Sequence, residues 1–284
     1  MNQNKYKQSP MNYTGNKYKL LPQLLPLFPD DINTFYDVCC GGLAVSMNVK
    51  ADKYVCNDID WHIIDMYKTI QLSDTFIDDV QNVLVQYGLR DASGDDVNAF
   101  NELRAAYNAT KDSVLFFALL TQSFNSILSY DSQGNCNSSY GHGKSGRCPG
   151  LSDVRLANLK VLSEWLKEND VNLLGNYFTD LCVEQEAFVY IDPPYLITHA
   201  AYNQTVWNNV DEYTMYRWLD NLNERGISWG MSNVLRNRGN VHIKLKRWSS
   251  KYNVIPIQHK YGSLAASDSK PTDTQEVYVC NYTK

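Results

Sequence analysis

Short apolar runs alternate with amphipathic stretches at both ends of the chain, an arrangement typical of an α/β protein. Residues 187–190 are four apolar residues in succession and predict a buried strand. Residues 54–57 and 226–233 predict further strands, and residues 211–224 have the pattern of a helix. Two closing strands are expected at residues 253–257 and 276–282.

This alternation disappears in the middle of the chain. Amphipathic stretches there predict helices at residues 74–88, 95–108, 112–124 and 152–167. Residues 131–147 are rich in Gly, Ser and Asn, a composition typical of a flexible loop or a hairpin. The pattern thus sets a block of helices and one polar segment inside a chain that otherwise alternates strands and helices.

The strand at residues 187–190 runs through Ile191 into Asp192-Pro193-Pro194-Tyr195. Proline cannot donate a hydrogen bond to a sheet, and it biases the residue before it toward an extended conformation. We therefore expect a rigid corner at the carboxyl end of the strand, the edge where open α/β sheets bind ligands. A proline-rich turn that only ends the strand is the alternative interpretation.

The corner would present a carboxylate, free carbonyls and an aromatic ring, which together suit chemistry at an amino group of a nucleic-acid base. Such an amino group is a poor nucleophile because its lone pair is delocalised into the ring. Acceptors for its N–H bonds return electron density to the nitrogen, and the ring of Tyr195 could stack on the base.

A glycine turn follows the predicted strand that contains Asp37, and a helix is expected after the turn. Gly41 and Gly42 would let the backbone pass close to a ligand. The dinucleotide fingerprint G-x-G-x-x-G is missing, which argues against a nicotinamide or flavin domain. Asp58 closes the next strand, 17 residues after Gly41, where nucleotide-binding α/β folds place a carboxylate on the ribose. Helix capping is the other interpretation of this carboxylate, and Asp60 offers a separate cap.

Tyr13, Gly15 and Lys17 precede residues 18–28, in which apolar residues recur at helical spacing. A glycine-containing turn that leads into a helix N-terminus presents free N–H groups to an anion. A plain N-terminal helix is the default interpretation of the same pattern.

Length and composition indicate one large domain or a domain with an insertion, since the chain has 284 residues. The formal net charge of −5 argues against a polyanionic partner, although basic residues cluster at 236–238 and 244–247. Seven cysteines without CxxC spacing indicate reduced thiols in a cytosolic protein, not a disulfide or metal framework. We expect neither a membrane span, because no run of about 18 apolar residues occurs, nor a secretory signal.

Taken in order, these motifs resemble the D12 class, the Dam-type adenine N6-methyltransferases of DNA. The resemblance rests on the aromatic-x-Gly-x-Lys motif at residues 13–17, the loop at residues 37–42, Asp58 and Asp192-Pro193-Pro194-Tyr195. It implies an α/β fold with a mostly parallel, Rossmann-like methyltransferase sheet. Residues 1–73 and 168–284 would form the catalytic, S-adenosylmethionine-binding domain, and residues 74–167 an inserted target-recognition domain of helices and a β-hairpin.

The resemblance also implies roles for particular residues. Asp192, the Pro193 carbonyl and Tyr195 would grip an adenine extruded from the duplex. S-adenosylmethionine would donate the methyl group, without a metal. The residues implied to bind this cofactor are Tyr13, Lys17, Gly41, Asp58, Phe178 and Asp192.

The inserted segment keeps the frame of the family's recognition hairpin but changes residues in it. Ser129, Asp131 and Ser139 replace the family's arginine, asparagine and proline. An arginine–guanine contact gives about 1–3 kcal/mol of discrimination, and a serine cannot make it, so the expected target is GATC or a variant. The residues expected to contact DNA are Asn125, Ser126, Asn137, Lys144 and Arg147.

The favoured interpretation is a site-specific DNA adenine N6-methyltransferase of the phage or bacterial kind. Its partner would be double-stranded DNA in the cytoplasm of a bacterial or phage-infected cell, with no obligatory protein partner. One alternative is an RNA or protein N-methyltransferase. The presence of Asp rather than Asn at position 192 argues against it, as does the long insert. The other is a catalytically inactive DNA-binding homologue, against which the intact Tyr13, Lys17 and Asp58 argue.

Overall fold

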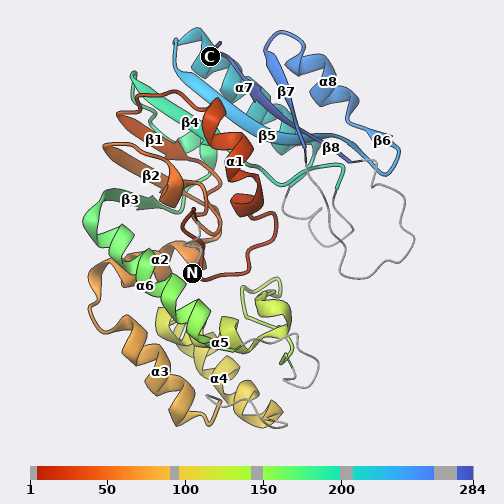
Figure 1. Cartoon of the computed structure of the whole chain (residues 1–284). Coiled ribbons are helices and arrows are strands. Elements are labelled where there is room, and N and C mark those ends of the chain that lie inside the picture. Colours follow the sequence, from red (N-terminus) through yellow and green to blue (C-terminus); the bar gives the residue numbers. More distant parts are fainter. Residues whose placement is uncertain (1–4, 90–95, 142–149, 199–206, 259–273, 284) are drawn as a thin grey trace. The chain divides into compact units, whose positions relative to one another are not determined.

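The computed structural model describes residues 5–89, 96–141, 150–198, 207–258 and 274–283. Contacts divide the chain into two compact units, each built from several separate segments (Figure 1). The first unit comprises Met1–Tyr18, Gly41–Asn48 and Asp60–Gly175. The second comprises Lys19–Cys40, Val49–Ile59 and Asn176–Lys284. The functional division at residues 74–167 remains a prediction.

The second unit is built on a sheet in which the strand order is β2-β1-β4-β5-β8-β7, with β6 paired to β5. Strands β2, β1, β4 and β5 run parallel, and β8 and β7 extend the sheet in antiparallel fashion. The mixed α/β fold with a Rossmann-like sheet is therefore confirmed. The strands are β1 (Thr34–Asp37), β2 (Lys53–Asn57), β4 (Ala187–Ile191), β5 (Ser228–Asn237), β6 (Asn240–Val241), β7 (Asn253–Ile257) and β8 (Gln275–Cys280).

Strands β1 and β4 are buried along their whole length, as expected for parallel strands inside a sheet. Phe28 packs against two side chains of β4, with ring centroids 5.0 Å from Phe188 and 5.1 Å from Tyr190. The helix expected at residues 18–28 is broken into short segments, in which prolines occupy first-turn positions. These segments are η1 (Lys17–Leu20), α1 (Leu21–Leu24) and η2 (Leu25–Leu27).

Two longer helices of the second unit begin at side-chain caps. In α7 (Asn209–Glu224), the Asn208 side chain accepts hydrogen bonds from two backbone N–H groups, and Asp211 completes a capping box. In α8 (Ile243–Ser249), the N-cap His242 accepts from the Leu245 N–H through Nδ1. The helix predicted at residues 211–224 is confirmed as α7, and the first turns of both helices are fixed by these caps.

The first unit is a helical block that surrounds α5 (Ser113–Gln122). The seven consecutive residues 116–122 of this helix are all buried, and α2, α3 and α4 contact it. The four helices predicted between residues 74 and 167 are confirmed. The elements of this unit are α2 (Trp61–Leu72), α3 (Phe76–Gln86), α4 (Val97–Thr110), α6 (Asp153–Glu168) and β3 (Asp170–Leu174).

Two details of the first unit differ from the sequence-based expectation. The helix expected after Gly41 and Gly42 is wrong: turns and the short η3 (Ser46–Asn48) occupy this stretch. Leu43 has φ 58, a left-handed conformation that a helix cannot include. The predicted hairpin is confined, among the described residues, to isolated bridges at Ser123↔Tyr140 and Tyr130↔Cys136.

Within the described ranges, no helix is both long enough and apolar enough to cross a membrane.

Candidate active site

Three carboxylates stand at the carboxyl ends of adjacent parallel strands. Asp37 ends β1, Asp58 follows β2 by one residue, and Asp192 follows β4 by one residue. Because β1 pairs with both β2 and β4 in parallel, these strand ends share one edge of the sheet. Burial raises the pKa of the Cys39 thiol, and the negative charges of Asp58, Asp192 and Asp37 raise it further. The thiol of Cys39 therefore stays protonated beside the edge of the sheet that carries the three carboxylates.

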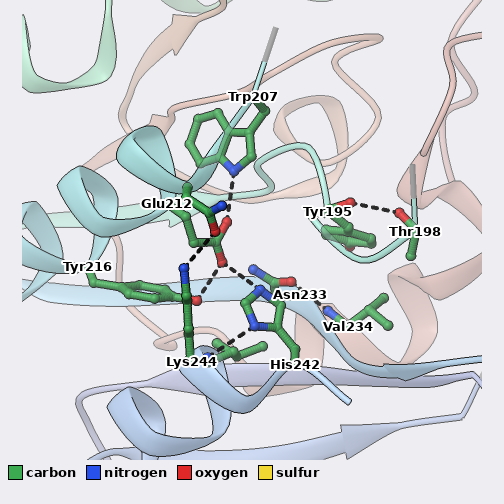
Figure 2. Close-up of polar contacts among 11 residues, drawn as sticks. Tyr195, Thr198, Trp207, Glu212, Tyr216, Asn233, Val234, His242 and Lys244 are labelled. Carbon is green, nitrogen blue, oxygen red and sulfur yellow. Dashed lines mark hydrogen bonds and ion pairs between the residues drawn. The ribbon is translucent and has the colours of Figure 1, made fainter. Parts of the chain in front are cut away.

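The proline corner is closed by hydrogen bonds of its own residues. The Tyr195 hydroxyl donates to Asp192 Oδ1 at 2.9 Å. Thr198 donates its hydroxyl and its backbone N–H to the Tyr195 carbonyl, at 3.0 and 3.1 Å, which locks the following turn (Figure 2). Burial and the neighbouring Asp192 charge raise the pKa of Tyr195, so this hydroxyl stays protonated and keeps donating. The orientation of the carboxylate is therefore fixed by the ring that the sequence predicted as a stacking surface.

Two further sets of hydrogen bonds lie among the strands that neighbour the corner. The hydroxyls of Tyr190 on β4 and Ser232 on β5 lie 2.6 Å apart in the buried sheet. The Asn57 side chain, at the end of β2, donates to the carbonyls of Val38 and Asn176 at 3.1 and 3.0 Å. The first contact joins β4 to β5, and the bond from Asn57 to Val38 joins the ends of β2 and β1, which carry Asp58 and Asp37.

A buried ionic cluster lies in the segment that follows the corner, and no sequence motif pointed to it. Glu212 of α7 is 0 % exposed and accepts from Trp207 Nε1 at 2.8 Å and from the Tyr216 hydroxyl. His242 Nε2 lies 3.0 Å from Glu212 Oε1 (Figure 2). Burial alone would raise the pKa of Glu212, but the contacts with His242, Trp207 and Tyr216 outweigh burial and lower it. Glu212 is therefore a buried, charged carboxylate that joins three segments.

Phe178, predicted to flank the cofactor, lies among aromatic rings of the same unit. It begins η6 (Phe178–Asp180), is 4 % exposed, and its ring centroid lies 5.9 Å from that of Trp207 and 5.6 Å from that of Trp218. The Tyr177 ring packs on it at 4.4 Å. Since Glu212 holds Trp207, the ionic cluster also supports the packing around Phe178.

In the first unit, two of the predicted cofactor-binding residues are in contact. Gly41 has φ +44, and a Cβ on it would lie 2.6 Å from Cε1 of the Tyr13 ring. The Gly41 carbonyl accepts from the Tyr67 hydroxyl at 2.7 Å, which fixes the peptide. Lys17 is buried, and its Nζ donates to the Gly15 carbonyl at 2.9 Å. The turn is thus a close-packed cradle that only glycine permits at position 41.

Of the predicted DNA contacts, Asn125 and Ser126 lie in one strained turn, with φ values of 56 and 52. Asn125 is exposed. Ser126 is buried and accepts from Arg155 Nη2 at 2.8 Å, while Arg155 Nη1 donates to the Gly150 carbonyl at 2.7 Å. Ser126 thus supports the turn from within. The role of Arg155 was not predicted, because nothing in the sequence distinguishes an arginine that anchors a turn from any other arginine on a helix.

The other predicted DNA contacts lie in or beside the polar loop. Asn137 is exposed, and its Oδ1 accepts from the Ser129 hydroxyl at 2.7 Å. Lys144 and Arg147 lie outside the described residues. No group of three or more His, Cys, Asp or Glu side chains among the described residues could hold a metal ion.

Acidic residues at adjacent strand ends of a mostly parallel sheet are typical of the nucleotide-binding class of α/β proteins. The family model of the D12 class N6 adenine-specific DNA methyltransferases matches residues 13–263, and the chain belongs to this family. The resemblance inferred from the motifs is thereby confirmed.

Curated relatives agree with this assignment. The chain is 33% identical to "Type II methyltransferase M.FokI" of Planomicrobium okeanokoites, over 99% of this chain and 44% of the relative. It is 34% identical to "Modification methylase StsI" of Streptococcus sanguinis, over 98% of this chain and 43% of the relative. A "DNA adenine methylase" of Haemophilus influenzae is 23% identical over 65% of this chain and 63% of its own length. The chain therefore spans less than half the length of the first two relatives.

Proposed function

We propose that the chain transfers a methyl group from S-adenosylmethionine to N6 of adenine at a specific sequence in double-stranded DNA. The observation that carries this proposal is the closed corner, in which the Tyr195 hydroxyl holds Asp192 at the strand edge shared with Asp58. Membership of the D12 class supports adenine N6 as the target. The cytoplasm of a bacterial cell is the expected place of action.

The chemistry of the donor set fits S-adenosylmethionine. Asp58 is 6 % exposed and would accept hydrogen bonds from ribose hydroxyls. The cradle at Gly41 brings backbone close to the Tyr13 ring, where Tyr13 and Lys17 would contact the methionine end. Phe178 would flank the cofactor's adenine. When bound, S-adenosylmethionine supplies a methyl group carried on a sulfonium.

At the corner, Asp192 and the Pro193 carbonyl would accept one N–H bond each from the adenine amino group. These two hydrogen bonds return electron density to the nitrogen and orient its lone pair. The locked backbone of the corner holds both acceptors before the base arrives, so that positioning contributes much of the rate. The surplus proton of the amino group leaves to the Asp192 carboxylate or to water.

Tyr195 has two tasks in this proposal. Its ring, which is partly exposed, would stack on the extruded adenine. Its hydroxyl fixes the rotation of the Asp192 carboxylate through the 2.9 Å hydrogen bond. Substitution by Phe would keep the first task and remove the second.

Methyl transfer from radiolabelled S-adenosylmethionine to duplexes of varied sequence tests the proposal. Label should appear in duplex DNA on N6-methyladenine, and Asp192→Ala should abolish transfer while the protein keeps the melting temperature of the wild type. Asp52→Ala, at an exposed aspartate beside β2, is the matched control and should keep wild-type activity. Label in RNA or protein instead of DNA, or full activity of Asp192→Ala, would overturn the proposal.

The recognition sequence is proposed to be GATC or a variant. Ser129, in place of the family's arginine, donates its hydroxyl to Asn137 and so serves the loop itself. Mapping methylated adenines in DNA from cells that express the chain would identify the site directly.

A further inference from the structure

One buried side chain, that of Asn57, makes hydrogen bonds to two segments beside the proposed cofactor site. Asn57 is the last residue of β2, is 2 % exposed, and precedes Asp58, the proposed acceptor for the ribose. Its Nδ2 makes two hydrogen bonds and its Oδ1 makes a third. A short side-chain amide supplies two donors and an acceptor, a combination that neither aspartate nor leucine of similar size offers. The identity of residue 57 is therefore matched to the groups that it contacts.

The first of these bonds continues the connection between β1 and β2 where the backbone ladder ends (β1 and β2 in Figure 1). The last paired residues of the two strands are Asp37 and Cys56. One residue further on, Asn57 Nδ2 donates to the Val38 carbonyl at 3.1 Å, and the Asn57 carbonyl accepts from the Cys40 N–H at 2.9 Å. The backbone that enters the glycine turn is thus held against the end of β2.

The same amide also holds a loop that is distant in sequence. Asn57 Nδ2 donates to the Asn176 carbonyl at 3.0 Å, and Asn57 Oδ1 accepts from the Asn176 N–H at 3.0 Å. Both polar backbone groups of residue 176 are therefore bonded to one side chain. These two bonds fix the place of the loop relative to the end of β2 without any contribution from the Asn176 side chain, which belongs to an exposed residue.

Tyr177 extends this constraint to Phe178, the residue proposed to flank the adenine of the cofactor. The Tyr177 ring centroid lies 4.4 Å from that of Phe178. The Tyr177 hydroxyl donates to Asp211 Oδ1 at 2.9 Å, in the first turn of α7. Phe178 therefore follows a loop that is held at Asn176 by the amide of Asn57 and at Tyr177 by α7.

Ribose and adenine are joined by a single bond, so a site that binds both requires a fixed spacing between its ribose acceptor and the ring that flanks its adenine. Groups in such a site must be held within about 0.5 Å, and hydrogen bonds from the residues behind them supply that precision. From these contacts we infer that Asn57 is a positioning residue for the adenosine half of S-adenosylmethionine, because it fixes Asp58 and Phe178 relative to each other. The inference rests on the proposed function, since it concerns the same cofactor site.

The test measures the affinity of the full chain and of its Asn57→Ala variant for S-adenosylhomocysteine by isothermal titration calorimetry, at a temperature where both are folded. The dissociation constant should rise roughly tenfold in the variant, the effect of one poorly made hydrogen bond to a charged carboxylate. KM for S-adenosylmethionine should rise in parallel, while KM for DNA stays at the wild-type value.

Asn281→Ala is the matched control, since the side chain of Asn281 is also an amide that makes three hydrogen bonds in the second unit. Its partners are the Trp229 N–H at 2.8 Å, the Asn223 side chain at 3.2 Å and the Ile227 carbonyl at 2.9 Å. Trp229 and Ile227 lie at the amino end of β5, the opposite edge of the parallel strands from Asp58. Both substitutions should lower the melting temperature, but only Asn57→Ala should weaken S-adenosylhomocysteine binding.

Hydrogen exchange of the wild-type chain provides a measurement that does not depend on a folded variant. The Asn176 N–H becomes free to exchange when its bond to Asn57 Oδ1 opens. A ligand slows exchange through such a local opening only if the opened state binds the ligand less tightly. Saturating S-adenosylhomocysteine should therefore slow exchange of the Asn176 N–H.

Three results would each overturn the inference alone: wild-type affinity in a folded Asn57→Ala variant, an equal loss of affinity in Asn281→Ala, or unchanged exchange at Asn176. If Asn57→Ala alone loses affinity but the wild-type chain transfers no methyl group to DNA, the inference stands and the proposed function is overturned. A wild-type chain that does not bind S-adenosylhomocysteine would overturn both.

Discussion

Removal of the Glu212 carboxylate should destabilise the second unit more than any exposed change on the same helix. Glu212 is completely buried and receives contacts from Trp207, Tyr216 and His242. Loss of the carboxylate leaves three buried donors without an acceptor and so costs about 3–5 kcal/mol in all, since each unsatisfied buried donor costs about 1–3 kcal/mol. Glu212→Ala should therefore lower the free energy of unfolding by about that amount. Glu212→Gln keeps one acceptor oxygen and should cost about 1–3 kcal/mol.

The pH dependence of the free energy of unfolding provides a second, independent test of this prediction. The pKa of Glu212 is lowered in the folded protein, so the folded state holds this proton less tightly than the unfolded chain. The stability contribution is therefore present above the unfolded pKa of about 4.3 and is lost as pH falls through the folded pKa. The difference between wild type and Glu212→Gln should be largest near neutral pH and shrink in acid.

Urea unfolding followed by tryptophan fluorescence provides the assay, since Trp207 is a direct partner of the carboxylate. Glu224→Gln is the matched control, because it makes the same chemical change at an exposed position near the end of α7. Equal unfolding free energies for the two Gln variants at pH 7 would refute the reasoning. So would a difference that grows as the pH is lowered.

Two further predictions concern the first unit. Gly41→Ala should weaken S-adenosylhomocysteine binding, measured by calorimetry, because the added Cβ would meet the Tyr13 ring. Gly88→Ala is the control: Gly88 also has a positive φ, but an added Cβ there would meet nothing within 4 Å, so binding should be unchanged. Burial, assisted by the Lys111 charge, lowers the pKa of His62 to about 4 from 6.5, so the folded state prefers the neutral imidazole. The contribution of His62 to stability should thus be constant above pH 6.5 and be lost as the pH falls toward 4. His62→Gln should reduce this loss in acid. A pKa of His62 near 6.5, measured by NMR, would contradict the prediction.

The features that could be predicted from the sequence are those that depend on residues close together in the chain. The strand at residues 187–191 and the stop at Asp192 follow from apolar residues and prolines that are adjacent in the chain. Asp60, a predicted helix cap, accepts from the His62 N–H as expected. Much of the helical block could also be predicted, because α3 and α4 each bury residues at helical spacing within one segment.

What could not be predicted depends on contacts that are distant in sequence. Glu212 meets His242, which lies 30 residues further on, and no spacing rule connects a helical glutamate to the cap of another helix. The helix expected after Gly41 fails at the left-handed Leu43, a conformation that the pattern of apolar residues does not encode. The basic residues at 236–238 are visible in the sequence, but the hydrogen bond from Asn237 to the Ile197 carbonyl is not.

Ser126, predicted as a DNA contact, has a structural task in the turn that it shares with Asn125. Its φ of 52 is left-handed, a conformation that glycine adopts most readily. Serine can occupy the position because its hydroxyl bonds to Arg155, a nearly buried arginine anchored in turn to the Gly150 carbonyl. The bond offsets part of the strain, which is of order 1–3 kcal/mol for such a residue. Asn125, exposed in the same turn, is therefore supported by the bond between Ser126 and Arg155.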